Sequence, residues 1–292
     1  MSRRTGDVPR DSRAWLPELA NLAHRARNVP LRIRALQLVN GAATVALSRP
    51  LGLIHVIEHP KCGGTWVRNM IQAYNGTERF LDDRLLRPRE VIQVHRQYRP
   101  WYWQRVVVVR DPRDMFVSFY YHETHYRRRE KGLVISRYFQ HDPSRPLHDD
   151  FAAYLEAKLM RRTHPPFTYT EFVRSWQDRP RTLQVRYEDF LGDPEQQLTR
   201  VVGHLGLELD PDRIRQAIDA NRFESATRER GKARRPGEAD PGEFERKGVA
   251  GDWRNHFDRR SCELIEKFEG WTLRELGYEN DGRWIERFLA GT

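Results

Sequence analysis

The segment His59-Pro60-Lys61-Cys62-Gly63-Gly64-Thr65-Trp66 carries the clearest chemical signal in this 292-residue chain. Its glycines allow the backbone to turn tightly against an anion. Free N–H groups at the start of a following helix favour negative charge, and Lys61 adds a mobile positive one. The segment therefore predicts a phosphate-binding loop. A loop for ATP and Mg²⁺ places Gly-Lys-Ser/Thr at its end. Here Lys61 precedes the glycines, so ATP–Mg²⁺ chemistry is disfavoured.

The flanking residues predict the elements that hold this loop. A β-branched strand, Leu53–His59, leads into it, and a helix, Thr65–Tyr74, leaves it. Val106–Val109 is a continuous apolar run, typical of a parallel strand buried on both faces. Shorter strands are expected at Val91–Val94 and Thr182–Arg186. Strands that alternate with helices indicate an α/β fold, a single P-loop-like domain with a central parallel sheet flanked by helices.

Apolar periodicity predicts the remaining helices. They cover Pro112–Arg127, Asp149–Met160, Thr170–Gln177, the segment after Pro194 with Leu198, Val201, Val202 and Leu205, Pro211–Ala220 and Cys262–Leu276. Residues 230–247 are rich in Gly, Pro and charge and predict a mobile loop. The expected organisation is a disordered tail (1–13), an N-terminal helical extension (14–50) and the α/β domain (51–292).

Three further motifs lie at predicted strand ends or in a loop. They are Arg110-Asp111-Pro112-Arg113-Asp114 with Ser118, then Tyr187-Glu188-Asp189, then Arg246-Lys247-Gly248-Val249-Ala250-Gly251-Asp252-Trp253. Together with the glycine loop, and in this order, they resemble the cytosolic-type sulfotransferases that use 3′-phosphoadenosine 5′-phosphosulfate (PAPS). The resemblance spans about residues 53 to 280.

The resemblance implies a donor site for PAPS, with adenosine 3′,5′-bisphosphate (PAP) as product and no metal. The 5′-phosphosulfate would be held by Lys61, Cys62, Gly63, Gly64, Thr65 and Trp66. The 3′-phosphate would be held by Arg110, Ser118, Arg246, Lys247 and Gly248. The adenine would contact Tyr187, Phe223 and Trp66. Lys61 would also neutralise the bridging oxygen as the sulfuryl group leaves. Trp66 and Tyr187 are equally compatible with packing in the core. For Cys62 we expect its N–H, rather than its sulfur, to meet the ligand.

A histidine near the acceptor is the expected general base. His95 follows the strand Val91–Val94, where the family has Lys-Thr-His and this chain has Gln93-Val94-His95. The family's first loop threonine is also replaced, by Gly64. The histidine is retained, but one cation and one hydroxyl are missing. Those departures keep a non-catalytic nucleotide-binding homologue open as an alternative, beside a P-loop kinase.

Composition narrows the partners. The formal net charge is +10, but the arginines are scattered and no nucleic-acid-binding motif is present. Two cysteines provide no disulfide framework and fit a reducing compartment. We see no signal peptide and no apolar run long enough for a transmembrane helix. The expected location is cytoplasmic, and the expected acceptor is a small molecule, lipid or carbohydrate.

The extension at 14–50 has two readings. Pro30 separates two amphipathic patterns, the second with apolar Leu36, Val39, Ala43 and Leu47. The pair either packs on the domain or presents a basic amphipathic surface to a membrane.

Overall fold

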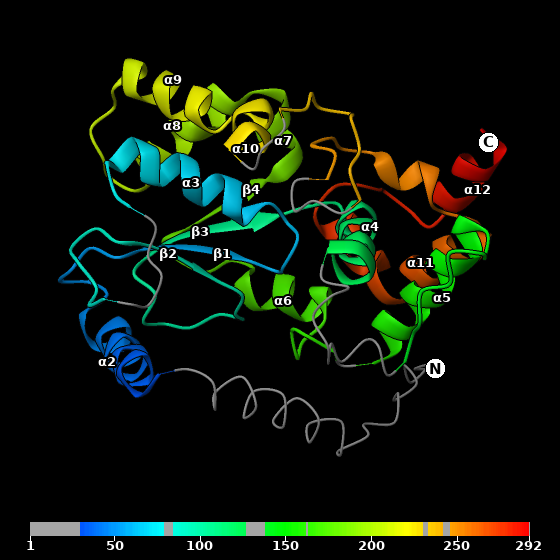
Figure 1. The fold of residues 1–292 in the computed structure, drawn as a ribbon, viewed down its shortest axis with the longest axis horizontal. Coiled ribbons are helices and arrows are strands. Elements are labelled where there is room, and N and C mark those ends of the chain that lie inside the picture. The colour runs from blue at the N-terminus through cyan, green and yellow to red at the C-terminus, as the bar shows by residue number, and fades with distance from the viewer. Residues whose placement is uncertain are drawn as a thin grey trace, which may run out of the picture.

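The computed structural model describes residues 30–78, 84–126, 138–161, 163–229, 233–241 and 246–291. At its centre lies a parallel four-stranded sheet in the order β2-β1-β3-β4 (Figure 1). The strands are β1 (Ile54–Glu58), β2 (Val91–Val94), β3 (Gln104–Val109) and β4 (Thr182–Arg186). The predicted α/β fold with a central parallel sheet is confirmed. Because the strands are parallel, their carboxyl ends share one edge, where ligands of such folds bind.

Helices cover both faces of this sheet. They are α3 (Gly64–Asn75), α4 (Pro112–Tyr121), α5 (Leu147–Met160), α6 (Tyr169–Trp176), α7 (Tyr187–Gly192), α8 (Pro194–His204), α9 (Pro211–Ala220), α10 (Phe223–Glu229), α11 (Arg259–Glu275) and α12 (Trp284–Ala290). Figure 1 shows α3, α8 and α9 above the sheet, and α4, α5 and α11 grouped beside it.

The alternation of β3 explains the two layers. Val106 and Val108 belong to the core under α3, α8 and α9, whereas Val107 and Val109 belong to the core with α4, α5, α6 and α11. Successive side chains of a strand point to opposite faces, so a strand covered on both sides must be apolar throughout. The continuous valine run meets that requirement.

Local signals fix where several helices begin. Asp111, Asp193 and Asp210 each accept hydrogen bonds from main-chain N–H groups at a helix start, and a proline follows each of them. Thr168 forms a capping box with Glu171 at the start of α6. Of these helices, α4 follows a strand directly, so the loop after β3 is short and turns into a helix at the carboxyl edge.

Some boundaries differ from expectation. The helix predicted at Pro112–Arg127 ends as an α-helix at Tyr121 and continues as a π-helical turn, His122–Tyr126; Arg127 lies outside the described residues. Tyr187, expected at a strand end, begins α7. Helices α10 and α12 were not predicted. Of the loop expected at 230–247, residues 230–232 and 242–245 lie outside the described part, and 233–241 form neither helix nor strand.

The described part of the N-terminal extension is α2 (Leu31–Leu47); the predicted tail and first helix lie outside the described residues. Its buried residue is polar. Asn40 is buried, donates through Nδ2 to Arg84 O (2.9 Å) and accepts from Leu86 N (3.1 Å). Val39 and Leu47 stay about half exposed. Among the described residues, no helix combines the length and apolarity that crossing a membrane requires.

Candidate active site

A cavity lies at the carboxyl ends of the strands, where the sequence motifs converge. Its lining includes Lys61, Gly63, Thr65, Trp66, Arg110, Ser118, Tyr187, Phe223, Arg246, Lys247 and Gly248, all of them predicted site residues. It also includes Glu58, Asn69, Leu191, Asn221, Ala226 and Val249, which were not predicted. Segments far apart in the sequence thus form one site. Cys62, Gly64 and His95 are the predicted residues outside this lining.

The glycine loop has the backbone conformation that its residues favour. Gly63 caps α3 with φ of 93°, and a Cβ there would lie 2.4 Å from the ring of Tyr187. Lys61 is also left-handed, with φ of 75°, which is uncommon for a residue with a side chain. Its carbonyl accepts from Arg110 Nη1 at 3.2 Å. Strain of this kind persists where neighbouring contacts hold it, commonly at functional sites.

Trp66 and Tyr187 form the aromatic wall. Trp66 donates through Nε1 to Asn221 O at 2.7 Å and meets Tyr187 edge-on, with ring centroids 5.8 Å apart. Burial raises the pKa of the Tyr187 phenol, so it stays neutral at physiological pH. Both rings pack and line the cavity at once, so the two readings of the sequence do not exclude each other.

Arg110 is a buried cation with poor partners. Its guanidinium donates to Lys61 O at 3.2 Å and Val249 O at 3.4 Å, and its Nε has no hydrogen-bond partner. It stacks 4.4 Å over the Tyr187 ring. Burial opposes the charge of Arg110, but Tyr187, Asp114 and Glu188 raise its pKa overall. Its donors stay only partly satisfied, and a guanidinium presents five donors in a fork that matches a phosphate. The geometry fits a phosphate group beside Ser118.

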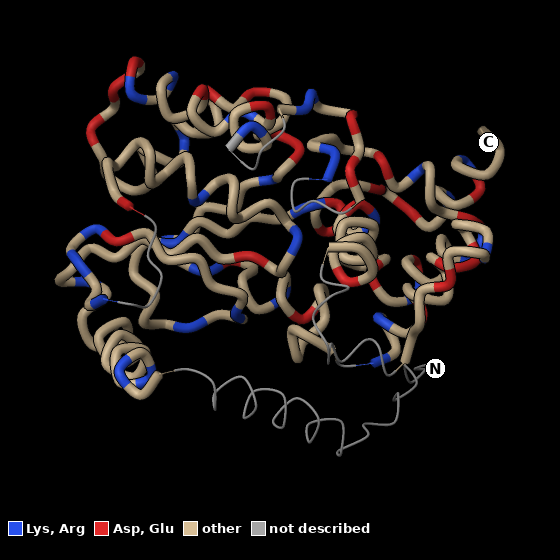
Figure 2. Tube along the Cα trace, in the orientation of Figure 1, with Lys and Arg blue, Asp and Glu red and all other residues tan. Residues whose placement is uncertain are grey.

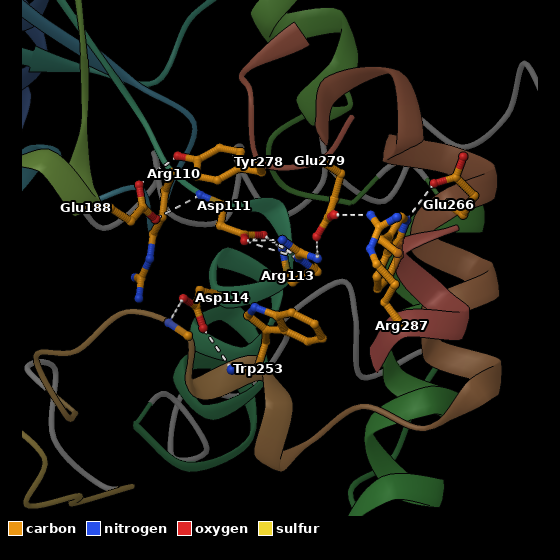
Figure 3. Close-up of polar contacts among 12 residues, drawn as sticks. Arg110, Asp111, Arg113, Asp114, Glu188, Trp253, Glu266, Tyr278, Glu279 and Arg287 are labelled. Atoms are coloured by element: carbon orange, nitrogen blue, oxygen red, sulfur yellow. Dashed lines mark hydrogen bonds and ion pairs between the residues drawn. The ribbon is translucent and has the colours of Figure 1, made fainter. Parts of the chain in front are cut away.

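A polar network behind Arg110 ties the motifs together (Figure 3). Asp114 accepts from Gly251 N (2.5 Å) and Trp253 N (2.8 Å), which fixes the end of the loop that carries Arg246 and Lys247. Glu188 accepts from Asp111 N (3.0 Å) and from the Tyr278 hydroxyl (2.7 Å). Each motif therefore supplies one cavity residue and at least one residue that orients another motif.

This network also bears on the kinase alternative. The only acid directly after the valine strand is Asp111, and its carboxylate accepts from Arg113 Nη2 at 2.7 Å while capping α4. Both oxygens are used and do not face an ion. Within the described residues, no cluster of three His, Cys, Asp or Glu side chains could hold a metal.

Arg246 and Lys247 reach the cavity but pair with Asp252, each at 2.5 Å. Burial opposes ionisation of Asp252, yet hydrogen bonds from His256 and Lys247 and the charge of Arg246 hold its pKa well below the usual value. The carboxylate is thus ionised at neutral pH. It gathers both cations at the mouth of the site.

Cys62 and Gly64 turn away from the cavity. The Cys62 thiol is fully buried, which raises its pKa, so the loop does not activate it. Its N–H donates to His59 O at 3.2 Å within the turn. The Gly64 N–H donates to the Glu58 carboxylate at 2.6 Å. Only part of the loop's main chain is therefore available to an anion.

His95 lies beside the cavity, next to Glu58. Its Nδ1 is 3.3 Å from the Glu58 carbonyl oxygen and 3.9 Å from Oε1 of the Glu58 carboxylate. Glu58 is the contributor that sequence reasoning missed. The available signal was an acid at the end of an otherwise apolar strand, directly before the phosphate loop.

The aromatic segment Trp101–Trp103 precedes β3, so it lies at the sheet edge opposite the cavity. Tyr102 is buried and stacks on His55 (4.5 Å), while the Arg49 and Arg181 guanidinium groups lie over Trp103. This cluster is part of the core and its rim.

In the described part of the chain, Lys and Arg do not gather in one stripe. Figure 2 shows Lys and Arg interspersed with Asp and Glu over most of the described chain. This mixed pattern agrees with the absence of a nucleic-acid-binding motif. The cations that indicate an anionic ligand are the ones that line the cavity.

Comparison with known proteins identifies the family of this chain. The family model of the sulfotransferase domain matches residues 103–277 of this chain. Rat (Rattus norvegicus) Sulfotransferase 1E1 is 26% identical over 249 residues, 76% of this chain and 82% of the relative. The chain belongs to the sulfotransferase domain family.

Solved structures share the fold. Mouse sulfotransferase SULT7A1, complexed with PAP, superposes with a TM-score of 0.57 at 18% identity, covering 86% of this chain and 93% of the other. Retinol dehydratase in complex with androsterone and PAP gives 0.56 at 20% identity, covering 77% and 81%.

Proposed function

We propose that this chain transfers a sulfuryl group from PAPS to a hydroxyl or amine of a small-molecule, lipid or carbohydrate acceptor, with His95 as base. The observation that carries the proposal is Arg110. It is a buried guanidinium with two long carbonyl contacts and an unpartnered Nε, facing a cavity that Ser118, Arg246 and Lys247 share. A 3′-phosphate would satisfy those donors, and the family assignment supplies the reaction.

PAPS supplies the sulfuryl group, and the leaving group is the 5′-phosphate of PAP. His95 takes the proton from the acceptor, whose oxygen forms a bond to sulfur as the bond from sulfur to the bridging oxygen breaks. Lys61 and the loop stabilise the charge that develops on that oxygen. Trp66, Tyr187 and Phe223 enclose the adenine side. The products are a sulfate ester and PAP, and the proton leaves His95 for solvent.

The test compares PAP with ATP–Mg²⁺ by titration calorimetry and thermal melting. PAP at about 100 times its Kd should stabilise the protein by roughly 2.7 kcal/mol, and ATP–Mg²⁺ should stabilise it far less. Arg110→Ala should weaken PAP binding by about 30- to 150-fold, the loss of a charged hydrogen bond worth roughly 2–3 kcal/mol.

Arg215→Ala is the matched control, because Arg215 is an exposed arginine on α9, remote from the lining residues. It should leave the PAP affinity unchanged. A preference for ATP–Mg²⁺, or equal losses in the two variants, would contradict the proposal. Turnover is then sought with labelled PAPS and a panel of phenol, sterol, sugar and amine acceptors. PAP binding with His95 intact and no transfer to any acceptor would favour the non-catalytic homologue.

We further propose that α2 meets a membrane surface peripherally. Leu31, Leu38 and Val45 lie seven residues apart, on one helix face, and are 81%, 76% and 53% exposed. Arg32 and Arg49 are exposed at the two ends of this face. Apolar side chains flanked by arginines suit the interface of an anionic bilayer.

Sedimentation with phosphatidylserine vesicles tests this surface. Changing Leu31, Leu38 and Val45 to Ser should abolish binding to the vesicles. Leu209→Ser, at a leucine outside α2 that is about as exposed as Val45, should not. Binding that survives the triple change would refute the α2 contact.

A further inference from the structure

Glu58 places a carboxylate in a site otherwise built for anions. It ends β1, its side chain is almost fully buried, and it lines the cavity with Lys61. Oε2 accepts from Gly64 N at 2.6 Å, and Oε1 accepts from Gln93 Nε2 at 2.5 Å. These partners are two of the positions at which the chain departs from the sulfotransferase pattern. Both of these departures therefore belong to one cluster with Glu58 at its centre.

The cluster has a fixed direction of donors. Gln93 Oε1 accepts from Arg68 Nη1 at 2.8 Å, so the Gln93 amide must point its NH₂ at Glu58. Gly64 leaves the space that the carboxylate occupies, since a Cβ there would lie 2.6 Å from Glu58 Cδ. The position of the carboxylate is thus determined by three elements, β1, β2 and α3.

His95 faces acceptors on its Nδ1 side. Both the carbonyl oxygen of Glu58 at 3.3 Å and its carboxylate at 3.9 Å lack a proton to give. Nδ1 must therefore carry the ring proton of neutral His95, which leaves the lone pair on Nε2. The side chain is 37% exposed, so Nε2 is within reach of an acceptor.

We propose that Glu58 is a positioning residue for the base. Its main-chain carbonyl, 3.3 Å from Nδ1, holds His95 in the Nδ1–H tautomer. Its carboxylate, 3.9 Å from Nδ1, stabilises the imidazolium that forms when Nε2 takes the acceptor's proton. A carboxylate behind a histidine stabilises the imidazolium in other general-base systems. The role rests on the proposed function.

Glu58→Gln is the decisive substitution, because it removes the negative charge and keeps the shape of the side chain. The main-chain carbonyl of residue 58 is unchanged, so His95 should keep its ring proton on Nδ1. The neutral amide cannot stabilise the imidazolium as the carboxylate does, so proton transfer to Nε2 should become slower.

The experiment uses the full chain with bound PAP and ¹⁵N-labelled histidine. Long-range ¹H–¹⁵N NMR should show Nδ1–H for His95 in the wild type and in Glu58→Gln, because the main-chain carbonyl that Nδ1 faces is the same in both. His141 is an internal reference, because its Nδ1 lies 2.8 Å from Asp150 and should not respond. Glu58→Asp keeps the negative charge and should lose far less activity than Glu58→Gln, compared at a temperature where thermal melting shows both variants folded.

Turnover with PAPS and 2-naphthol as a phenolic probe supplies a second readout. Glu58→Gln should lower kcat by roughly 100-fold with His95 present and by less than about threefold in a His95→Asn background. Nε2–H in the wild type, or equal rate losses in both backgrounds, would overturn the positioning role. Loss of PAP binding in the wild type would instead overturn the proposed function.

Discussion

Gly64→Ala should change the stability of the protein in opposite directions in the wild type and in a variant that lacks the Glu58 side chain. Gly64 is the first residue of α3 and does not adopt a left-handed conformation. On helix propensity alone, Gly64→Ala would stabilise the protein by about 0.5–1 kcal/mol. The added Cβ, however, would lie 2.6 Å from Glu58 Cδ and 2.9 Å from Glu58 Oε1.

The clash decides the sign in the wild type. Glu58 is tied to Gly64 N and Gln93 Nε2, so its carboxylate cannot move without losing a buried hydrogen bond. Overpacking of this kind costs about 1–3 kcal/mol. Gly64→Ala should therefore destabilise the wild type by roughly 1–2 kcal/mol. In a Glu58→Ala background the space is open, and the same change should be neutral or stabilising.

Urea denaturation of the four proteins of the cycle gives the coupling energy, expected at about 1.5–3 kcal/mol. Gly203→Ala is the control, because a Cβ at that helical glycine meets nothing within 4 Å. It should stabilise both backgrounds equally. Additivity of Gly64→Ala and Glu58→Ala within about 0.5 kcal/mol would refute the geometry assigned to Glu58.

Three further changes test other parts of the fold. Glu269 is fully buried, and burial raises its pKa from 4.5 to about 7 despite hydrogen bonds from Thr170 and Thr272. The folded state keeps this proton longer than the unfolded state, so stability should fall by roughly 3 kcal/mol as pH rises from 4.5 through 7; Glu269→Gln should remove that fall in urea melts. The lowered pKa of Asp252 has the opposite sign, so its stabilisation is present above about pH 4 and lost in acid; Asp252→Asn should destabilise the protein at pH 7 and flatten the acid limb of its melting temperature. Gly248, with φ of 65° and a virtual Cβ 2.5 Å from the Phe223 ring, should not accept Ala; Gly248→Ala should weaken PAP binding at least tenfold in calorimetry, and an unchanged Kd would contradict the contact.

The sequence predicted the elements whose signals are local. Each of these elements can be recognised within a few residues: the valine run, the Asp-Pro pairs at helix starts and the glycine loop. The structure places them as expected. The extent of α7 was missed because Tyr187-Glu188-Asp189 follows a strand directly, and nothing nearby separates the two. The anchoring of α2 through Asn40 was missed because this polar residue makes its contacts with a loop distant in sequence.

The site residues also divide into those with a local sequence signal and those without one. The motifs identified most residues that line the cavity, since each motif places a cation or ring directly after a strand. Glu58 could not be assigned from local pattern, because its meaning lies in Gly64 and Gln93, which are six and thirty-five positions away. Taken separately, those two positions suggested a weakened enzyme. Together with Glu58, they form one connected set of hydrogen bonds.

The two arginines of Arg110-Asp111-Pro112-Arg113 show why such assignments need the structure. Arg113 donates to both oxygens of Asp111 and, at 2.6 Å, to Glu279, and it stacks 4.1 Å over Trp253. Its guanidinium is satisfied by the protein. Arg110, three residues earlier and also buried, has two long carbonyl contacts and an idle Nε, and Figure 3 shows it extending away from Glu188. A buried charge that the fold leaves undersatisfied is stable only if a ligand completes it, or if its cost is offset elsewhere. That difference, rather than the motif itself, assigns Arg110 to the ligand and Arg113 to the scaffold. It follows that Arg113→Ala should lower the melting temperature far more than Arg110→Ala, whereas Arg110→Ala should affect PAP binding more at temperatures where both variants are folded.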